Sequence, residues 1–153
     1  MAHGLDRLTL IEIRIALEEL NTDFNYFLDH GEVDRLLDLF TDDVYYTHGE
    51  RVSHGKHELE QVFRRRSAAG PRTTRHLYSG LKLDVESADC VRGTCVCATF
   101  GANALPPVPT ATPTLVADFD DLYVRGEDGR WRIKERHIRR LFVDPANSGP
   151  VGR

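Results

Sequence analysis

The segment TTRHLYSG, residues 73–80, places a histidine, His76, near the start of an alternating run that continues as LKLDV. Imidazole changes its charge near neutral pH, so a histidine held in a pocket can serve as a general base. His76 is one of 7 histidines in the chain. The residues alone leave two interpretations open, a catalytic base or a polar side chain on a strand.

A second candidate for acid–base chemistry is the segment ADFDDLY, residues 117–123. Asp118 and Asp120 share one face of the expected strand, opposite Phe119 and Asp121. Burial would raise the pKa of such a carboxyl group and let it act as an acid or a base. A charged strand surface that faces water explains the same pattern equally well.

The cysteines indicate ordinary thiols. Cys90, Cys95 and Cys97 are odd in number, and the last two share one face of an expected strand. Because no further ligands stand at a suitable spacing, we predict buried, reduced thiols and no metal site. Reduced thiols are typical of the cytoplasm.

Length and charge exclude several classes of protein. The 153 residues fit one domain with a sizeable core. A net charge of −4 and an isoelectric point of about 6.0 argue against a dedicated nucleic-acid binder, and we interpret the RRR run at 64–66 as a solvated helix end. No apolar run suits a membrane span, and the first residues do not resemble a signal peptide. We expect a cytoplasmic protein without nucleic-acid or membrane partners.

The first third of the chain has a helical period. TLIE places Thr9 as N-cap and Glu12 at the third helical position, and Gly31 ends the pattern. A short second helix follows, and a third helix comes after a short strand at 44–48. The second helix presents the apolar residues Val33, Leu36, Leu37 and Phe40, and the third presents Leu59, Val62 and Phe63.

From Arg72 onward the hydrophobic period is two, which predicts strands. Four longer strands are expected at 73–86, 90–103, 114–125 and 130–142. Helices followed by antiparallel strands predict an α+β domain with its helices on one face of a curved sheet. We assign a single domain to residues 1–143 and a flexible tail to residues 144–153.

Three segments resemble a known family. The family is the SnoaL-like group of the nuclear transport factor 2-like superfamily, in its scytalone dehydratase-like branch. The segments that are similar to its members are FLDHGEVDRLLDLFTDDVYY, RTTRHLYSGLKLDV and DGRWRIKERHI. The resemblance covers roughly residues 8–142. It implies a cone-shaped, curved antiparallel or mixed sheet with three N-terminal helices packed on its concave face, a cystatin-like α+β barrel. The open end of such a cone admits a small hydrophobic or aromatic molecule.

The resemblance assigns a catalytic dyad. In the dehydratase-like branch an aspartate at a helix end pairs with a strand histidine, and the matching residues here are Asp29 and His76. Strict alternation puts His76 on the face opposite the leucines that follow it. Glycine in a strand often marks a bulge, so we predict one at Ser79–Gly80 that turns His76 inward.

The resemblance also indicates residues that line the pocket. Many dehydratase-like members have a tyrosine five residues before the aspartate, where this chain has Phe24. The missing phenol is available from Tyr26, Tyr46 or Tyr78, unless these rings only pack. His48 falls near a pocket tyrosine of scytalone dehydratase.

Three charged residues complete the candidate substrate-binding set. The resemblance places Asp118 and Asp120 in the pocket. Arg136, on the last strand, is a candidate for holding an anionic group.

The implied activity is that of a cofactor-independent lyase or isomerase. Asp29 orients His76, which removes a proton from a small hydrophobic ring compound such as a polyketide, terpenoid, steroid or aromatic intermediate. Two alternatives stay open, a non-catalytic binding module or dioxygenase-type small subunit, and a polyketide cyclase or epoxide hydrolase that uses pocket carboxylates. By analogy with the family, we expect a homodimer or larger assembly.

Overall fold

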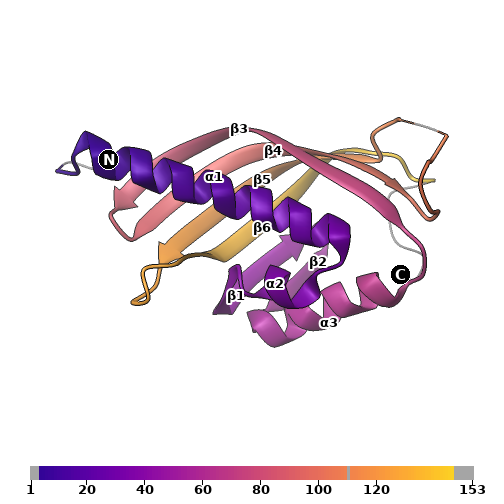
Figure 1. Cartoon of the computed structure of the whole chain (residues 1–153), viewed down its shortest axis with the longest axis horizontal. Coiled ribbons are helices and arrows are strands. Elements are labelled where there is room, and N and C mark those ends of the chain that lie inside the picture. Colours follow the sequence, from indigo (N-terminus) through magenta and orange to yellow (C-terminus); the bar gives the residue numbers. More distant parts are fainter. Residues whose placement is uncertain (1–3, 110, 147–153) are drawn as a thin grey trace.

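The computed structural model describes residues 4–109 and 111–146. Its sheet has six strands in the order β2-β1-β6-β5-β4-β3, with β1 parallel to β6 and the other pairs antiparallel (Figure 1). The elements follow the order α1 (Arg7–His30), α2 (Val33–Leu37), β1 (Phe40–His48), β2 (Arg51–His54), α3 (Gly55–Ala68), β3 (Thr73–Ser87), β4 (Cys90–Ala102), β5 (Leu115–Arg125) and β6 (Trp131–Val143).

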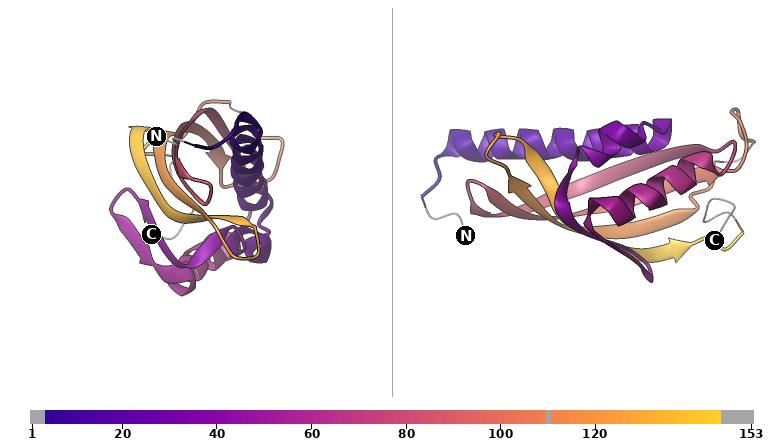
Figure 2. Two further views of the ribbon diagram at one scale, coloured as in Figure 1. Left: turned by 90° about the vertical axis from the view of Figure 1, so that its left-hand side faces the viewer. Right: turned by 90° about the horizontal axis from the view of Figure 1, so that it is seen from below.

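The predicted α+β class and its layers are confirmed. Figure 2 shows the curved sheet, and the helices lie on its inner side, α1 along β3 and α3 against β1. The sheet is mixed and not closed into a barrel. The apolar core fills the space between α1 and the concave face, where Leu17, Phe24 and Phe119 are buried. The four longer strands begin and end within one residue of their predicted positions.

The beginning of α1 differs from its predicted position. Asp6, not Thr9, is the N-cap, and its carboxylate accepts hydrogen bonds from the Thr9 backbone N–H and hydroxyl, both at 2.9 Å. The upstream carboxylate satisfies a free N–H of the first turn, so the helix starts earlier than the capping box predicts. At the other end, Gly31 adopts the left-handed conformation at φ 69° and ends the helix as predicted.

The second helix is shorter than its hydrophobic stripe predicts. It ends at Leu37, and Phe40 is already the first residue of β1. The Phe40 ring is fully buried and packs edge-on against Phe24 at 6.0 Å between ring centroids. Phe40 therefore packs into the predicted core, but it does so from a strand and not from a helix.

Strand β3 contains the predicted bulge. Ser79 pairs with Val96 and Lys82 with Thr94, so β3 holds one residue more than β4 between these pairs. Gly80 supplies the left-handed conformation at φ 66°. The extra residue changes the alternation, so His76 shares the inner face with Leu81.

The prediction of buried thiols holds for two of the three cysteines. Cys95 and Cys97 are buried free thiols, and burial raises their pKa values to about 12 and about 11, whereas Cys90 is only partly buried. Of the predicted tail, residues 147–153 lie outside the described residues, and the Asp144 backbone N–H donates to the Thr114 carbonyl at 2.9 Å. None of the described helices has the length and apolarity needed to cross a membrane.

Candidate active site

Asp29 and His76 lie in direct contact. Asp29 is on the last turn of α1, and the Asp29 Oδ1 atom is 2.5 Å from His76 Nδ1. The Asp29 Oδ2 atom also accepts the His76 backbone N–H at 2.9 Å. Only 5% of the Asp29 side chain and 12% of the His76 side chain are exposed. The helix end and the bulged strand thus hold both groups in one orientation.

The Asp29 carboxylate stays ionised in this environment. Burial acts to raise its pKa, but the hydrogen bonds and charge of His76 and the Thr74 hydroxyl outweigh burial, so the pKa is lowered. Because an ionised carboxylate only accepts hydrogen bonds, His76 Nδ1 must carry the proton of the neutral ring. His76 Nε2 then holds a free lone pair, and it has no hydrogen-bond partner within the part of the chain that the structure describes.

Thr74 and Arg66 support the dyad from behind. The Thr74 hydroxyl donates to Asp29 Oδ1 at 2.8 Å and accepts from Arg66 Nη2 at 3.3 Å. Arg66 Nη1 also donates to the Leu28 carbonyl at 3.0 Å, which ties α3 to the end of α1. The interpretation of the RRR run as a solvated helix end is therefore wrong for Arg66, which is partly buried. The sequence analysis did not identify Thr74 as a site residue. It could have been found from its spacing, because it lies two residues before His76 and so on the same strand face.

The aromatic candidates have different positions. Phe24 is buried between Phe40 and Phe119 in the core. Tyr46 is buried as well, and burial raises its pKa. Tyr26 is corrected as a pocket candidate, since it is 51% exposed and stacks on His30 at 4.0 Å on the outer side of α1.

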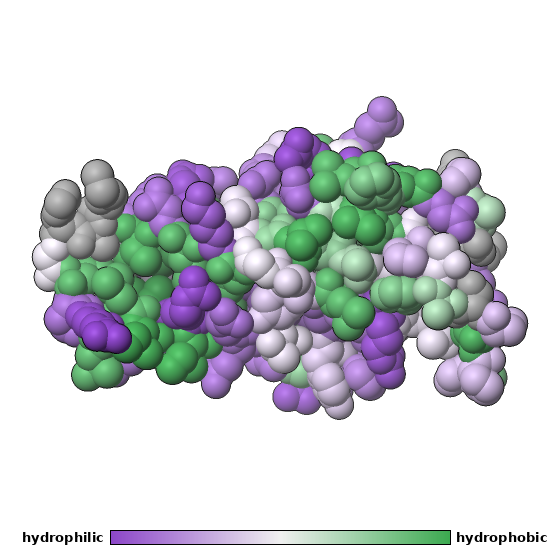
Figure 3. All heavy atoms as spheres, turned by 90° about the horizontal axis from the view of Figure 1, so that it is seen from above, coloured by the Kyte–Doolittle hydropathy of each residue, from purple (hydrophilic) through white to green (hydrophobic). Residues whose placement is uncertain are grey.

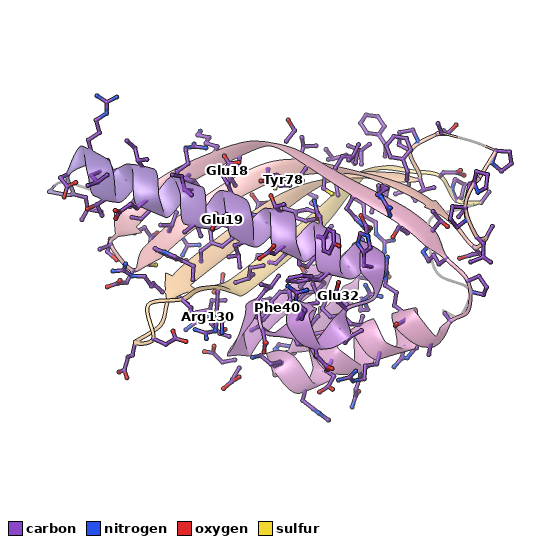
Figure 4. The ribbon with its side chains drawn as sticks, viewed as in Figure 1. Glu18, Glu19, Glu32, Phe40, Tyr78 and Arg130 are labelled. Atoms are coloured by element: carbon purple, nitrogen blue, oxygen red, sulfur yellow. The ribbon has the colours of Figure 1, made fainter. Side chains whose placement is uncertain are left out.

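Tyr78 faces α1 on the inner side of β3. Its hydroxyl donates to the Glu18 carbonyl at 3.1 Å, and Figure 4 shows it beside Glu18. The Thr22 hydroxyl lies 3.4 Å from the same oxygen. These contacts hold the phenol against the helix, two residues from His76.

Asp118 and Asp120 lie on the outer face of the sheet. Asp118 forms an ion pair with Arg139 at 2.5 Å, and Asp120 is exposed opposite His137. Their neighbours Phe119 and Asp121 point into the core instead. The placement of Asp118 and Asp120 in the pocket is therefore corrected, because alternation along β5 turns both carboxylates outward.

Arg136 forms its hydrogen bonds with other residues of the core. It is fully buried, and Nε and Nη2 each donate to Asp121 at 2.8 Å, while Nη2 also donates to Asn21 at 2.6 Å. The Tyr123 hydroxyl donates to Asp121 at 2.6 Å. Burial acts to lower the pKa of Arg136, but the Asp121 carboxylate outweighs it and the pKa is raised. The anionic group that Arg136 holds is Asp121, a partner that the sequence analysis did not identify.

His48 lies at the end of β1, opposite Arg51 of β2. Burial, followed by the charges of Arg140, Arg51 and His76, lowers the pKa of His48 to about 3. The ring is therefore neutral at physiological pH. His48 pairs with Ile138, and Ile138 with Phe119, both of which are buried, so the His48 side chain lies on the inner face of the sheet, as His76 does.

Two grooves lie outside the dyad. One runs between the end of α1, α2 and α3 and includes Val33 and Arg64, and the other follows α1 past Arg14 and Thr22. Asp29 and His76 line neither of them, and the small exposed part of the dyad belongs mainly to His76. Among the described residues, His, Cys, Asp and Glu side chains form no group of three that could hold a metal ion.

The family model for the SnoaL-like domain matches residues 9–137. The chain belongs to the SnoaL-like family. A comparison with curated proteins finds no match to this SnoaL-like chain.

Solved structures share the fold of the SnoaL-like chain. A proposed scytalone dehydratase from Novosphingobium aromaticivorans DSM 12444 is 21% identical over 94% of this chain and 95% of its own, with a TM-score of 0.76. A hexachlorocyclohexane dehydrochlorinase, LinA type 2, is 19% identical over 97% of this chain and 100% of its own, with a TM-score of 0.74. A protein with a cystatin-like fold from Nostoc punctiforme PCC 73102 is 21% identical over 87% of this chain and 94% of its own, with a TM-score of 0.73.

Proposed function

We propose that this SnoaL-like domain is a cofactor-independent lyase or isomerase that acts on a small hydrophobic ring compound. The contact between Asp29 and His76 supports this proposal most strongly. His76 Nε2 removes a proton from a substrate carbon, and Asp29 stabilises the imidazolium that forms. In an elimination, the electron pair of the broken C–H bond forms a double bond, and hydroxide or chloride leaves the adjacent carbon with its own electron pair. In an isomerisation, the imidazolium returns the proton to another carbon.

A hydrophobic substrate agrees with the apolar interior of the fold. The interior between helices and sheet contains the rings of Phe24, Phe40, Phe63 and Tyr46. Structural neighbours named as a proposed scytalone dehydratase and a hexachlorocyclohexane dehydrochlorinase support an elimination on a ring compound.

A non-catalytic binding or structural domain is the second candidate. The tight packing of Phe24, Phe119 and the Arg136–Asp121 pair through the interior favours it. The third possibility, a cyclase or epoxide hydrolase that uses Asp118 or Asp120, has lost its support because both carboxylates face outward.

The test begins with a ligand and measures proton abstraction. Mass spectrometry of denatured protein identifies small molecules retained through purification, and these compounds and their ring analogues are then incubated with the enzyme in D2O. We expect deuterium incorporation or elimination that falls by about 10²–10⁴-fold in His76→Gln, the range of general-base catalysis. His137→Gln is the control, because His137 lies on the outer face of the sheet. Equal rates in wild type and His76→Gln would reject the base, and retention without turnover would favour the second candidate.

We also propose a homodimer or larger assembly in the cytoplasm. The outer sheet face carries Leu77 and Phe142, which are 57% and 71% exposed, and Val96. Figure 3 shows hydrophobic side chains gathered on the side of the molecule that includes β3. Free thiols are consistent with a reducing compartment. Light scattering after size exclusion measures the assembly directly.

A further inference from the structure

Two arginines flank His48 from neighbouring strands. Arg51 of β2 is the residue paired with His48 across the β1–β2 hairpin, and Arg51 Nη2 lies 3.1 Å from His48 Nδ1. Arg140 of β6 lies against Gly49, because a Cβ atom placed on Gly49 would be 3.0 Å from Arg140 Cζ. The positive charges of both arginines act on the His48 ring. This end of the sheet therefore gathers two guanidinium groups around one imidazole.

Neither guanidinium meets a carboxylate. Among the described residues, the Arg140 side chain makes no hydrogen bond or ion pair, and the Arg51 guanidinium bonds only to the His48 ring. Other arginines on β6 are neutralised, Arg136 by Asp121 and Arg139 by Asp118. A positive charge thus accumulates at this end of a chain whose net charge is −4.

His48 adds a hydrogen-bond donor that lacks an acceptor. Since the Arg51 guanidinium can only donate, His48 Nδ1 accepts and Nε2 must carry the hydrogen. Within the described part of the chain, His48 Nε2 is shielded from solvent and has no hydrogen-bond partner. Unpaired buried donors are rare in native proteins and call for an acceptor. The low pKa of His48 agrees with this assignment, because the neutral ring retains a single N–H.

We propose that His48, Arg51 and Arg140 bind an anionic oxygen group of the ligand, such as a carboxylate or sulfonate. The anion would accept from His48 Nε2 and compensate the two guanidinium charges. His48 pairs with Ile138, and Ile138 pairs with Phe119, so the His48 side chain lies on the inner sheet face of these buried residues, the face that also carries His76. The anionic group would therefore bind on the same face as the dyad. The substrate class narrows to hydrophobic ring compounds that carry an acid group, an inference that rests on the proposed function because it concerns the ligand of the same site.

Two fluorescent probes with the same ring system test the inference. 8-Anilinonaphthalene-1-sulfonate carries a sulfonate that N-phenyl-1-naphthylamine lacks, and neither probe needs to react. Titration of the full chain should show about tenfold tighter binding of the sulfonate probe, which corresponds to about 1.4 kcal/mol. The preference should fall to about threefold or less in Arg140→Gln and in Arg51→Gln, and Arg140→Lys should restore part of it.

Arg130→Gln is the matched control. It removes one positive charge from an exposed arginine at the β5–β6 hairpin, which Figure 4 places at the end of the sheet near the start of β6. This variant should keep the wild-type preference, and circular dichroism verifies the fold of each variant. Two independent variants keep the test valid if one of them fails to fold.

Each other outcome contradicts the proposal in a distinct way. Equal binding of both probes rejects the anion site and leaves the dyad mechanism standing. A sulfonate preference that survives in both arginine variants places the anion elsewhere and also rejects the site. Failure of both probes to bind rejects the anion site together with the hydrophobic substrate class of the proposed function.

Discussion

The carboxylate of Asp29 binds both the ring Nδ1 and the backbone N–H of His76. The helix end therefore fixes the imidazole and the strand that carries it together. Rotation of the ring away from Asp29 would leave one oxygen still bound to the strand. This double attachment restricts the position of His76 Nε2, which general-base catalysis requires.

The first prediction concerns the shared action of the pair. Asp29→Asn removes the charge that stabilises the imidazolium and allows either tautomer of His76, so deuterium exchange should fall by about 10²–10⁴-fold. The double variant with His76→Gln should be no slower than His76→Gln alone, because the two residues act as a unit. Rates that multiply in the double variant would show independent roles.

The second prediction concerns the pH dependence of stability. The folded pKa of His48 is lowered from 6.5 to about 3, so the unfolded chain binds a proton that the folded chain rejects between these values. Stability should therefore decrease as the pH falls from about 6.5 towards 3, and His48→Gln should remove part of this decrease. Urea unfolding at several pH values measures the slope. Exposed His57→Gln is the control, and equal slopes in wild type and His48→Gln would refute the assignment.

The third prediction compares two ion pairs on β5. Asp121→Asn leaves the buried Arg136 charge uncompensated and should lower the free energy of unfolding by about 3–5 kcal/mol. Asp118→Asn removes the partner of the exposed Arg139 and should change it by about 0–1 kcal/mol. Chemical denaturation measures both variants. Equal losses of unfolding free energy in the two variants would show that the buried Arg136–Asp121 pair stabilises the fold no more than the exposed pair.

The fourth prediction concerns the bulge. A Cβ on Gly80 meets no atom within 4 Å, so Gly80→Ala introduces only the strain of the left-handed conformation. We expect a loss of about 1–2 kcal/mol in unfolding free energy. Ser79→Ala, at the exposed neighbouring position, should stay within about 0.5 kcal/mol. A Gly80→Ala variant as stable as wild type would mean that the strand can pair without this conformation.

The sequence predicted the elements better than their contacts. The dyad and the bulge followed from local patterns and the family resemblance, because the motifs around Asp29 and His76 are continuous segments. Tyr26 was misplaced although its helical position, between the buried Phe24 and Phe27, already pointed away from the core.

Other contacts depend on residues far apart in the chain. Alternation along β5 separates Asp118 from Asp121 but does not say which face is buried, since both faces carry carboxylates. The buried face is decided by Arg136, which binds Asp121 and Asn21. These two partners lie 15 and 115 residues away from Arg136 in the sequence. Local periodicity contains no information about such pairings.

The bulge divides β3 into two segments whose inner faces make different contacts. Before Gly80, the inner face presents Thr74 and His76 to Asp29, and after it, Leu81 packs into the core. Under the proposed function, substitutions in the first segment should change ligand preference while Leu81 keeps its place in the core, because the register after Gly80 is set by the bulge.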